Sequence, residues 1–279
     1  GFGREYEEFY PLSKLGGVAV KGMTLLEKAG NPPPRIAETP SGMLNSVGLQ
    51  NPGIDYFIEH ELPNLIHKDT RIIANVAGST AEDCVTIAQK LEPTAVDMIE
   101  LNISCPNVKQ GGAAFGISCS SAADITAKVR KATTKPLMVK LSPNVTSISE
   151  IAKAVEAAGA DAVSLINTLL GMKIDINTRR PVLKNNVGGL SGPAVFPVAL
   201  RMVWQVANAV SIPVVGMGGI EKWQDAVEML LAGASALQMG AAIFADPYAP
   251  LKVIDGLNEY LDSHNIGKVT ELVGKVQPW

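Results

Sequence analysis

Short apolar segments that alternate with amphipathic ones constrain the fold of this chain more than any other feature of its sequence. The apolar segments are rich in Val, Ile and Leu, end in turn residues, and lack a strict apolar–polar alternation. Such runs are typical of strands in a sheet that is buried on both faces. Strands are expected at about residues 17–21, 72–77, 98–103, 137–141, 162–167, 213–216 and 236–239. Because helical segments lie between them, the pattern predicts an α/β protein with a parallel sheet.

Two of the intervening segments begin with a helix-capping signal. Ser79 stands three residues before Glu82, which predicts a capping box ahead of a helix at about 84–91. Ser147 and Glu150 repeat this spacing further along the chain. We therefore expect helices that start at defined residues and cover the sheet.

The number of strands favours a barrel with one strand outside the sequence. The pattern supplies seven strands, whereas a closed (β/α)8 TIM barrel has eight. We predict one barrel domain over residues 1–279, with the first strand missing ahead of Gly1, since the chain starts on Gly and not on Met. A barrel without that strand would expose open strand edges. The alternative fold is an open, doubly wound sheet.

Two connections are too long to be simple loops between a strand and a helix. They run over about residues 22–53 and 169–193. Both follow a strand, so both are expected on the face where barrel enzymes keep their active sites. Long excursions in a compact domain are typical of lids or binding loops.

Composition excludes several classes of partner and site. The net charge is -3 and no run of Lys or Arg occurs, which argues against nucleic acid or an anionic membrane as partner. Cys84, Cys105 and Cys119 are widely spaced, which argues against a disulfide framework and for a reducing compartment. The chain lacks the ligand pattern of a zinc site or an iron–sulfur cluster, so no metal is expected. Without a long apolar run or a signal peptide, we expect a cytoplasmic protein.

Cys105 is the strongest candidate for a catalytic side chain. It follows the strand at 98–103 and precedes Pro106, so it lies in a rigid loop at the mouth of the predicted barrel. A free cysteine is more often a buried structural residue, and position alone leaves both readings open. Cys84 and Cys119 fall within or near helices, and we expect both to be structural.

Two lysines end apolar strands. Lys21 and Lys140 would point into the barrel mouth, which is costly unless each meets an anion or an electron-rich ring. The alternative is that both side chains extend to solvent. Amide side chains at strand ends and loops suit a planar ligand with imide edges, such as a pyrimidine or an isoalloxazine. These amides, with one neighbouring hydroxyl, are Asn45, Asn75, Asn102, Asn167 and Thr168.

Glycines follow the last two strands. Gly218 and Gly219 follow one of them, and Gly240 precedes Ala241 after the other. Loops in these positions of a barrel commonly hold a phosphate with backbone N–H groups, and glycine lets the backbone approach it closely. The alternative is that the glycines only form tight turns.

Over essentially its whole length, the chain resembles the dihydroorotate dehydrogenases. The resemblance rests on NPPPRIAETPSGMLNSVGLQNPG at 31–53, IELNISCPNVKQGGAAFG at 99–116, VKLSPNVT at 139–146, INTLLG at 166–171, GGLSGP at 188–193 and GMGG at 216–219. The stretch around Cys105 is similar to the heteromeric, NAD-linked subfamily. The membrane-bound, quinone-linked class has serine there, and the fumarate-linked class has a different loop after Pro106.

The resemblance implies FMN as cofactor and oxidation of dihydroorotate to orotate in pyrimidine synthesis. Cys105 would take the proton from C5 of the substrate while hydride leaves C6 for flavin N5, Lys21 would lie near flavin and substrate, and Lys140 near the flavin pyrimidine edge. The implied substrate-binding residues are Lys21, Asn45, Ser46, Val47, Gly48, Leu49, Asn102, Asn167 and Thr168. The implied FMN-binding residues are Lys21, Asn75, Asn102, Lys140, Ile166, Gly192, Gly218, Gly219, Gly240 and Ala241.

The resemblance also implies a partner. The subfamily passes electrons to NAD through a subunit that carries FAD and a 2Fe-2S cluster, around a homodimeric core of a heterotetramer. The chain departs from the family where its first strand is absent, at Ala241, where a hydroxyl residue is common, and at 117–123. The alternatives are a dihydropyrimidine dehydrogenase-type flavoenzyme acting on uracil or thymine, a flavin-free barrel for a phosphorylated substrate, and a non-catalytic subunit.

Overall fold

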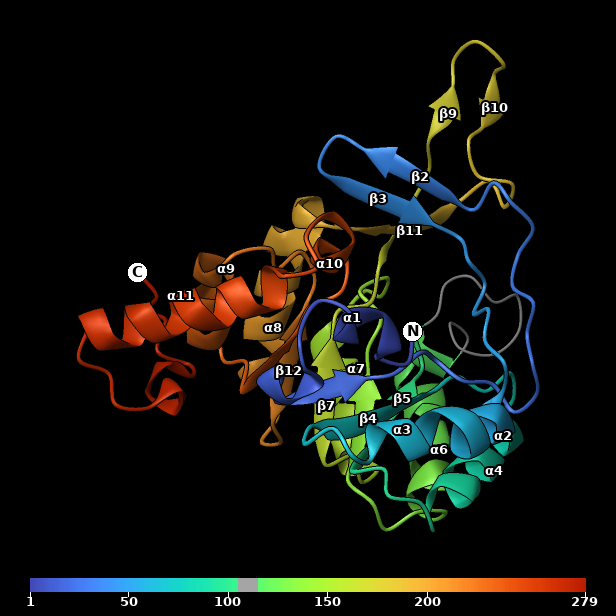
Figure 1. Ribbon diagram of the computed structural model, residues 1–279, viewed down its shortest axis with the longest axis horizontal. Helices are drawn as coiled ribbons and strands as arrows, with labels where there is room; N and C mark the ends of the chain where they lie inside the picture. Colours follow the sequence, from blue (N-terminus) through green and yellow to red (C-terminus); the bar gives the residue numbers. More distant parts are fainter. Residues whose placement is uncertain (105–114) are drawn as a thin grey trace.

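Seven parallel strands form one curled sheet in the computed structural model, which describes residues 1–104 and 115–279. The sheet runs in the order β1-β4-β5-β6-β7-β12-β13 (Figure 1). Its strands are β1 (Gly17–Ala19), β4 (Arg71–Val76), β5 (Met98–Asn102), β6 (Leu137–Lys140), β7 (Ala162–Leu165), β12 (Val214–Met217) and β13 (Ala236–Gln238). Each of the seven predicted strands is confirmed, with ends that differ by at most two residues.

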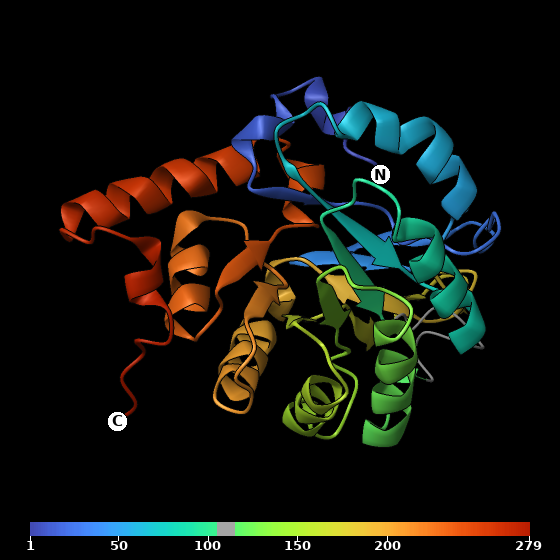
Figure 2. The same cartoon turned by 90° about the horizontal axis from the view of Figure 1, so that it is seen from below.

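Helices surround the outer face of this sheet (Figure 2). The longer ones are α4 (Ala81–Leu91), α6 (Cys119–Arg130), α7 (Ile148–Ala157), α8 (Phe196–Ala207), α9 (Trp223–Leu231) and α11 (Ala249–Ser263). The order of the strands in the sheet follows their order in the chain, whereas in a doubly wound sheet the order reverses at a switch point. The fold is therefore the predicted α/β TIM-type barrel and not the open alternative. In the described residues, β1 and β13 form the two edges of the curled sheet.

The two long connections are not loops but build a second sheet. Strands β2 (Ile36–Thr39), β3 (Gly42–Asn45), β8 (Leu169–Gly171) and β11 (Gly188–Ser191) pair antiparallel in the order β2-β3-β11-β8. A hairpin of β9 (Ile174–Asp175) and β10 (Arg180–Pro181) projects beyond it (Figure 1). The sequence predicted the position of both excursions but not their pairing, because residues so far apart in the chain carry no local signal of contact.

Short helices complete the described chain. They are α1 (Arg4–Glu7), η1 (Leu12–Lys14), α2 (Ile54–Tyr56), the π-helix η2 (Phe57–Glu61), α3 (Leu62–Leu65), η3 (Pro193–Val195), α10 (Ala242–Ala245) and η4 (Val269–Leu272). Throughout residues 1–104 and 115–279, no helix combines the length and the apolar character needed to cross a membrane.

One predicted helix cap is confirmed and the other is wrong by one residue. The Ser147 hydroxyl accepts a hydrogen bond from the Glu150 backbone N–H at the start of α7. At α4 the cap is Thr80, not Ser79: its hydroxyl accepts from the Asp83 N–H at 3.0 Å. The Asp83 carboxylate in turn accepts from the N–H groups of both Ser79 and Thr80. The physical reason is that a Thr–Asp pair offers the same reciprocal bonds one residue later.

Successive side chains of β5 point alternately into the apolar core and into the interior of the barrel. Ile99 and Leu101 are fully buried in the core between sheet and helices. Successive side chains of a strand point to opposite faces, so Glu100 and Asn102 project to the other side, into the barrel. The polar residues of this strand thereby reach the site described next.

Candidate active site

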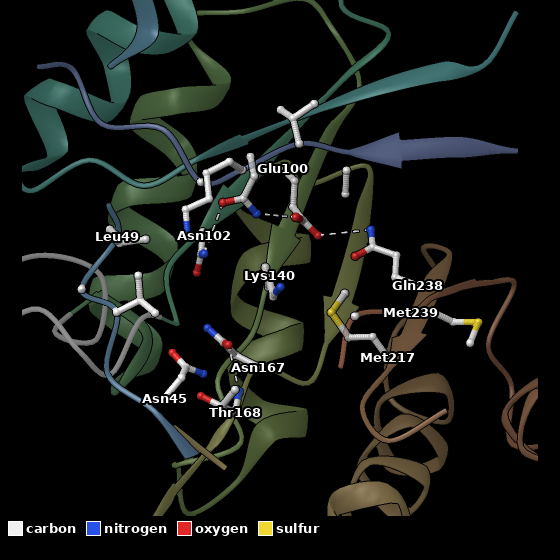
Figure 3. A pocket seen from close by; sticks show the side chains of 18 residues that line it. Asn45, Leu49, Glu100, Asn102, Lys140, Asn167, Thr168, Met217, Gln238 and Met239 are labelled. Atoms are coloured by element: carbon white, nitrogen blue, oxygen red, sulfur yellow. Dashed lines mark hydrogen bonds between the residues drawn. The ribbon is translucent and has the colours of Figure 1, made fainter. Parts of the chain in front are cut away.

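A cavity of about 320 Å³ opens among the carboxyl ends of the barrel strands (Figure 3). The second sheet contributes to its wall through the end of β3 and the loop that follows. Many residues that the sequence singled out line this one cavity: Lys21, Asn45, Val47, Gly48, Leu49, Asn75, Asn102, Lys140, Asn167, Thr168 and Gly240. Amides, hydroxyls and two ammonium groups from distant parts of the chain are thus brought together.

The two lysines line the cavity from the ends of two different strands. Lys140 is the last residue of β6, where it is in register with Asn102 of the neighbouring β5. Figure 3 shows its side chain between Asn102 and Asn167. Lys21 follows β1 and lines the same cavity. Both are therefore placed at the barrel mouth, where an anion or a polarisable ring would offset the cost of partly burying their charge.

A chain of hydrogen bonds connects the amides on three strands. The Asn102 Nδ2 donates to Asn75 Oδ1 at 3.3 Å, and the Asn102 Oδ1 accepts from the Ser104 hydroxyl at 2.8 Å. The Asn167 Nδ2 donates to the same hydroxyl at 2.7 Å. The Thr168 N–H donates to the Asn167 Oδ1 at 2.8 Å. These amides are held in fixed positions before any ligand binds, as a site that recognises a planar polar ring requires.

Glu100 is a site residue that the sequence reasoning missed. It is 1% exposed and its carboxylate lines the cavity. It accepts hydrogen bonds from Asn75 Nδ2, from the Ser164 hydroxyl at 2.7 Å and from Gln238 Nε2 at 3.5 Å. A signal was present: a lone acidic residue within an apolar strand, two residues before Asn102, lies on the same face as that asparagine. Gln238, in a similar position on β13, was missed too.

Glycines with left-handed backbone angles form a separate cluster at the start of α8. Gly192, Gly218 and Gly219 have φ of 102°, 122° and 76°. A Cβ on Gly219 would come within 2.8 Å of the backbone of both Gly192 and Phe196, the first residue of α8. A Cβ on Gly218 would come within 3.0 Å of Ile166. The backbone is therefore close-packed at a helix N-terminus, an arrangement that binds phosphate.

These features fit FMN, which combines a flat ring carrying an imide edge with a phosphate. The amide-lined cavity offers donors and acceptors for the ring, and the glycine cluster offers backbone N–H groups for the phosphate. No side chain caps the start of α8, so its first N–H groups lack a side-chain partner within the described chain. Met217 lines the cavity and directly precedes Gly218, which connects the two parts.

Other predicted residues lie outside the cavity wall. Ile166, Gly192, Gly218 and Gly219 belong to the glycine cluster, whereas Ala241 precedes the four-residue helix α10. Gly240 does line the cavity, but it has open space where a Cβ would lie, so no close approach of protein atoms requires glycine there. Ser46 is fully buried, and its hydroxyl has no hydrogen-bond partner among the described residues.

Two of the three cysteines lie in the described part of the chain, one buried and one exposed. Cys105 lies outside the described residues, directly after Ser104 of the amide chain. Cys84 is buried in α4, and burial raises the pKa of its thiol to about 12, so it stays protonated and unreactive at neutral pH. Cys119 is exposed at the start of α6. Within residues 1–104 and 115–279, no three Cys, His, Asp or Glu side chains are grouped so as to hold a metal ion.

Comparison with known proteins identifies relatives along the whole chain. The family model described as dihydroorotate dehydrogenase matches residues 1–261. A protein of Bacteroides thetaiotaomicron is 56% identical over 278 residues, covering 99% of this chain and 92% of the relative. A protein of Parabacteroides distasonis is 58% identical over 275 residues, covering 98% and 90%. A protein of Thermoanaerobacter pseudethanolicus is 54% identical over 277 residues, covering 99% and 92%. Each is named dihydroorotate dehydrogenase B (NAD(+)), catalytic subunit.

Proposed function

This chain belongs to the dihydroorotate dehydrogenase family, and from that premise we propose that it is the FMN-binding catalytic subunit of an NAD-linked enzyme. Its reaction is the oxidation of dihydroorotate to orotate in pyrimidine synthesis. The observation that carries the proposal is the cavity at the strand ends, where Lys21 and Lys140 converge with the amides of Asn75, Asn102 and Asn167. A flavin-free barrel explains the glycine cluster but gives no role to these lysines and amides.

The cofactor site divides between the cavity and the glycine cluster. Asn75, Asn102 and Lys140 line the part of the cavity that accepts the ring, and Lys140 supplies a positive charge to stabilise the reduced form. Gly192, Gly218 and Gly219 bring closely packed backbone to the start of α8, where N–H groups can hold a phosphate. When bound, FMN supplies the acceptor for the hydride that leaves C6 of the substrate.

The substrate site lies on the side of the cavity formed by the second sheet and the ends of β5 and β7. Asn45, Asn102, Asn167 and Thr168 offer donors and acceptors that match the imide edge of dihydroorotate. The loop 46–49 closes this side, with Gly48 and Leu49 both in the left-handed region at φ of 78° and 58°. A Cβ on Gly48 would meet the backbone of Asn31 at 2.8 Å, so glycine is required for this closure.

Two residues act on the reacting atoms in this proposal. Cys105 removes the proton from C5 of dihydroorotate as a thiolate, because only the ionised sulfur is an effective base. Lys21 lines the same cavity, where its ammonium group would attract the negatively charged substrate. Asn102 and Asn167 both bond to Ser104, which holds the segment that leads into Cys105.

Electrons leave through a partner in the proposed enzyme. The relatives are named as NAD(+)-linked catalytic subunits, and a catalytic subunit implies a second kind of chain. We assign to that chain FAD and a 2Fe-2S cluster, around a homodimer of the present chain. These cofactors pass electrons from the flavin to NAD.

The decisive experiment is a flavin absorption spectrum. The purified protein, supplied with FMN, is titrated without oxygen with dihydroorotate and, separately, with dihydrouracil. We expect dihydroorotate to bleach the flavin band and dihydrouracil to leave it unchanged. Bleaching by dihydrouracil alone would identify the dihydropyrimidine dehydrogenase-type reaction instead. A protein that binds no FMN at all would contradict both.

A further inference from the structure

Glu100 combines complete burial with an unusual set of neighbours. It lies in the middle of β5, is 1% exposed, and receives hydrogen bonds from three other strands of the barrel. In the described ranges it takes part in no ion pair, although ten such pairs occur there. Its three donors, Asn75, Ser164 and Gln238, are all neutral. Burying a carboxylate among neutral groups is costly, so a carboxylate kept in this position is expected to serve the site beside it.

Glu100 restricts the orientation of neighbouring amides because of the hydrogen bonds that a carboxylate can form. An ionised carboxylate can only accept, whereas an asparagine amide can present either its oxygen or its nitrogen. Facing Glu100, Asn75 must therefore present Nδ2, and its Oδ1 is turned to Asn102. Asn102 must then present Nδ2 to Asn75, and its own Oδ1 is turned to Ser104. The buried carboxylate thus determines the orientation of Asn75, and together with the Ser104 N–H it determines that of Asn102.

Gln238 meets the carboxylate of Glu100 from another strand and is oriented in the same way. Gln238 presents Nε2 to Glu100 and keeps its oxygen for the cavity that it lines. Figure 3 shows Gln238 on one side of Glu100 and Asn102 on the other; a dashed line joins Gln238 to the carboxylate, whereas Asn102 is connected to it through Asn75. All three amides line the cavity. Their orientation decides where a bound ring meets a donor and where it meets an acceptor.

We propose that Glu100 is a positioning residue that orients the amides of Asn75, Asn102 and Gln238 for the flavin and the substrate. It touches neither ligand in this role and acts only through those amides. The inference rests on the proposed function, since it takes FMN as the ligand of the cavity. A reversed amide places a donor against a donor, and such a mismatch lowers affinity by about tenfold or more.

The test replaces the carboxylate by its neutral isostere. In Glu100→Gln the new amide can donate as well as accept, so the orientation of Asn75 is no longer determined. The dissociation constant of FMN is measured by titrating the apoprotein with FMN, and the positions of the bound flavin absorption bands are recorded. We expect the dissociation constant to rise at least about tenfold, with displaced bands. The melting temperature of the apoprotein should stay within about 4 °C of the wild-type value.

Two control variants separate positioning from a general structural role. Glu61→Gln removes a buried carboxylate that pairs with Arg4 outside the cavity, and it should leave the FMN constant unchanged. Ser164→Ala removes one donor to Glu100 but leaves its contact with Asn75, so it should change that constant by less than about threefold.

Two results would overturn the inference. One is a Glu100→Gln protein whose FMN constant and flavin bands match the wild type. The other is a Glu100→Gln apoprotein whose melting temperature falls by clearly more than about 4 °C, which would make Glu100 a structural residue. Neither outcome bears on the proposed reaction, which is tested by bleaching with dihydroorotate. Conversely, a wild-type protein that binds FMN but ignores dihydroorotate contradicts the reaction and leaves the Glu100 test intact.

Discussion

Carboxylates serve opposite purposes at the two ends of the barrel sheet. At the amino ends, Asp97 accepts from the Ile72 N–H at 2.8 Å and pairs with Arg71. Asp161 likewise accepts from the Leu137 N–H at 2.8 Å and pairs with Arg130. Each carboxylate joins the start of one strand to the start of its neighbour, in contact with solvent and with a cation.

On the side of the carboxyl ends, which carries the cavity, the acidic group is Glu100 in the middle of β5; it is buried and meets only neutral donors among the described residues. Glu100 accepts from Asn75 and Gln238, which line the cavity, from the Ser164 hydroxyl, and from no backbone N–H group of the described residues. This barrel therefore stabilises its fold at one end and orients its polar side chains at the other, as is expected of barrel enzymes. Substitutions at the two ends should therefore change different measured quantities.

The largest expected effect is at the carboxyl end. Cys105→Ala should slow reduction of the bound flavin by dihydroorotate by about 10²- to 10⁴-fold, because the variant has no base for the C5 proton. FMN should remain bound with unchanged affinity, since the thiol acts on the substrate. Anaerobic stopped-flow absorbance measures the rate. Reduction at a near-normal rate would remove Cys105 from the role of base.

Lys140→Ala should have the next largest effect. Loss of the ammonium group from the cavity should weaken FMN binding by about tenfold or more, as measured by titration of the apoprotein. Lys153→Ala is the matched control, because Lys153 is an exposed lysine on α7 that pairs with Glu150. If both variants bind FMN as the wild type does, Lys140 has no part in holding the cofactor.

Asp161→Asn tests the amino end of the sheet. The neutral side chain still accepts from the Leu137 N–H but loses the ion pair with Arg130, so the free energy of unfolding should fall by about 1 kcal/mol. Denaturant unfolding measures the change. FMN affinity should be unaffected. A variant that loses FMN affinity without losing stability would break the division between the two ends.

The smallest effect concerns pH and Glu92, another carboxylate at the amino end. Hydrogen bonds from the hydroxyls of Thr133 and Thr134 lower the pKa of this carboxyl from 4.5 to about 2. A lowered pKa contributes stability that is present above the unfolded value and is lost as pH falls toward the folded one. The stability advantage of the wild type over Glu92→Gln should therefore shrink between pH 4.5 and pH 2. Thermal unfolding across this range measures it, and a constant difference would contradict the assignment.

Much of the fold and the site was predictable because the signals are local. Each strand is an apolar run, and the residues that end parallel strands meet at one edge of the sheet. For that reason Lys21, Lys140, Asn75, Asn102 and Asn167 could be placed around one cavity before the structure was known. The cap of α4 was misplaced by one residue because Ser79 and Thr80 both precede acidic residues at capping distance.

Local sequence patterns are enough to predict the barrel, the face that carries the site and most of the side chains that line it. They do not show that the two long excursions pair as one sheet, or that Glu100 of β5 meets Asn75 of β4, Ser164 of β7 and Gln238 of β13. The physical reason is that periodicity fixes which face of a strand a residue occupies. The partners it meets across the barrel depend on strand order and register, which are set by packing of the whole chain.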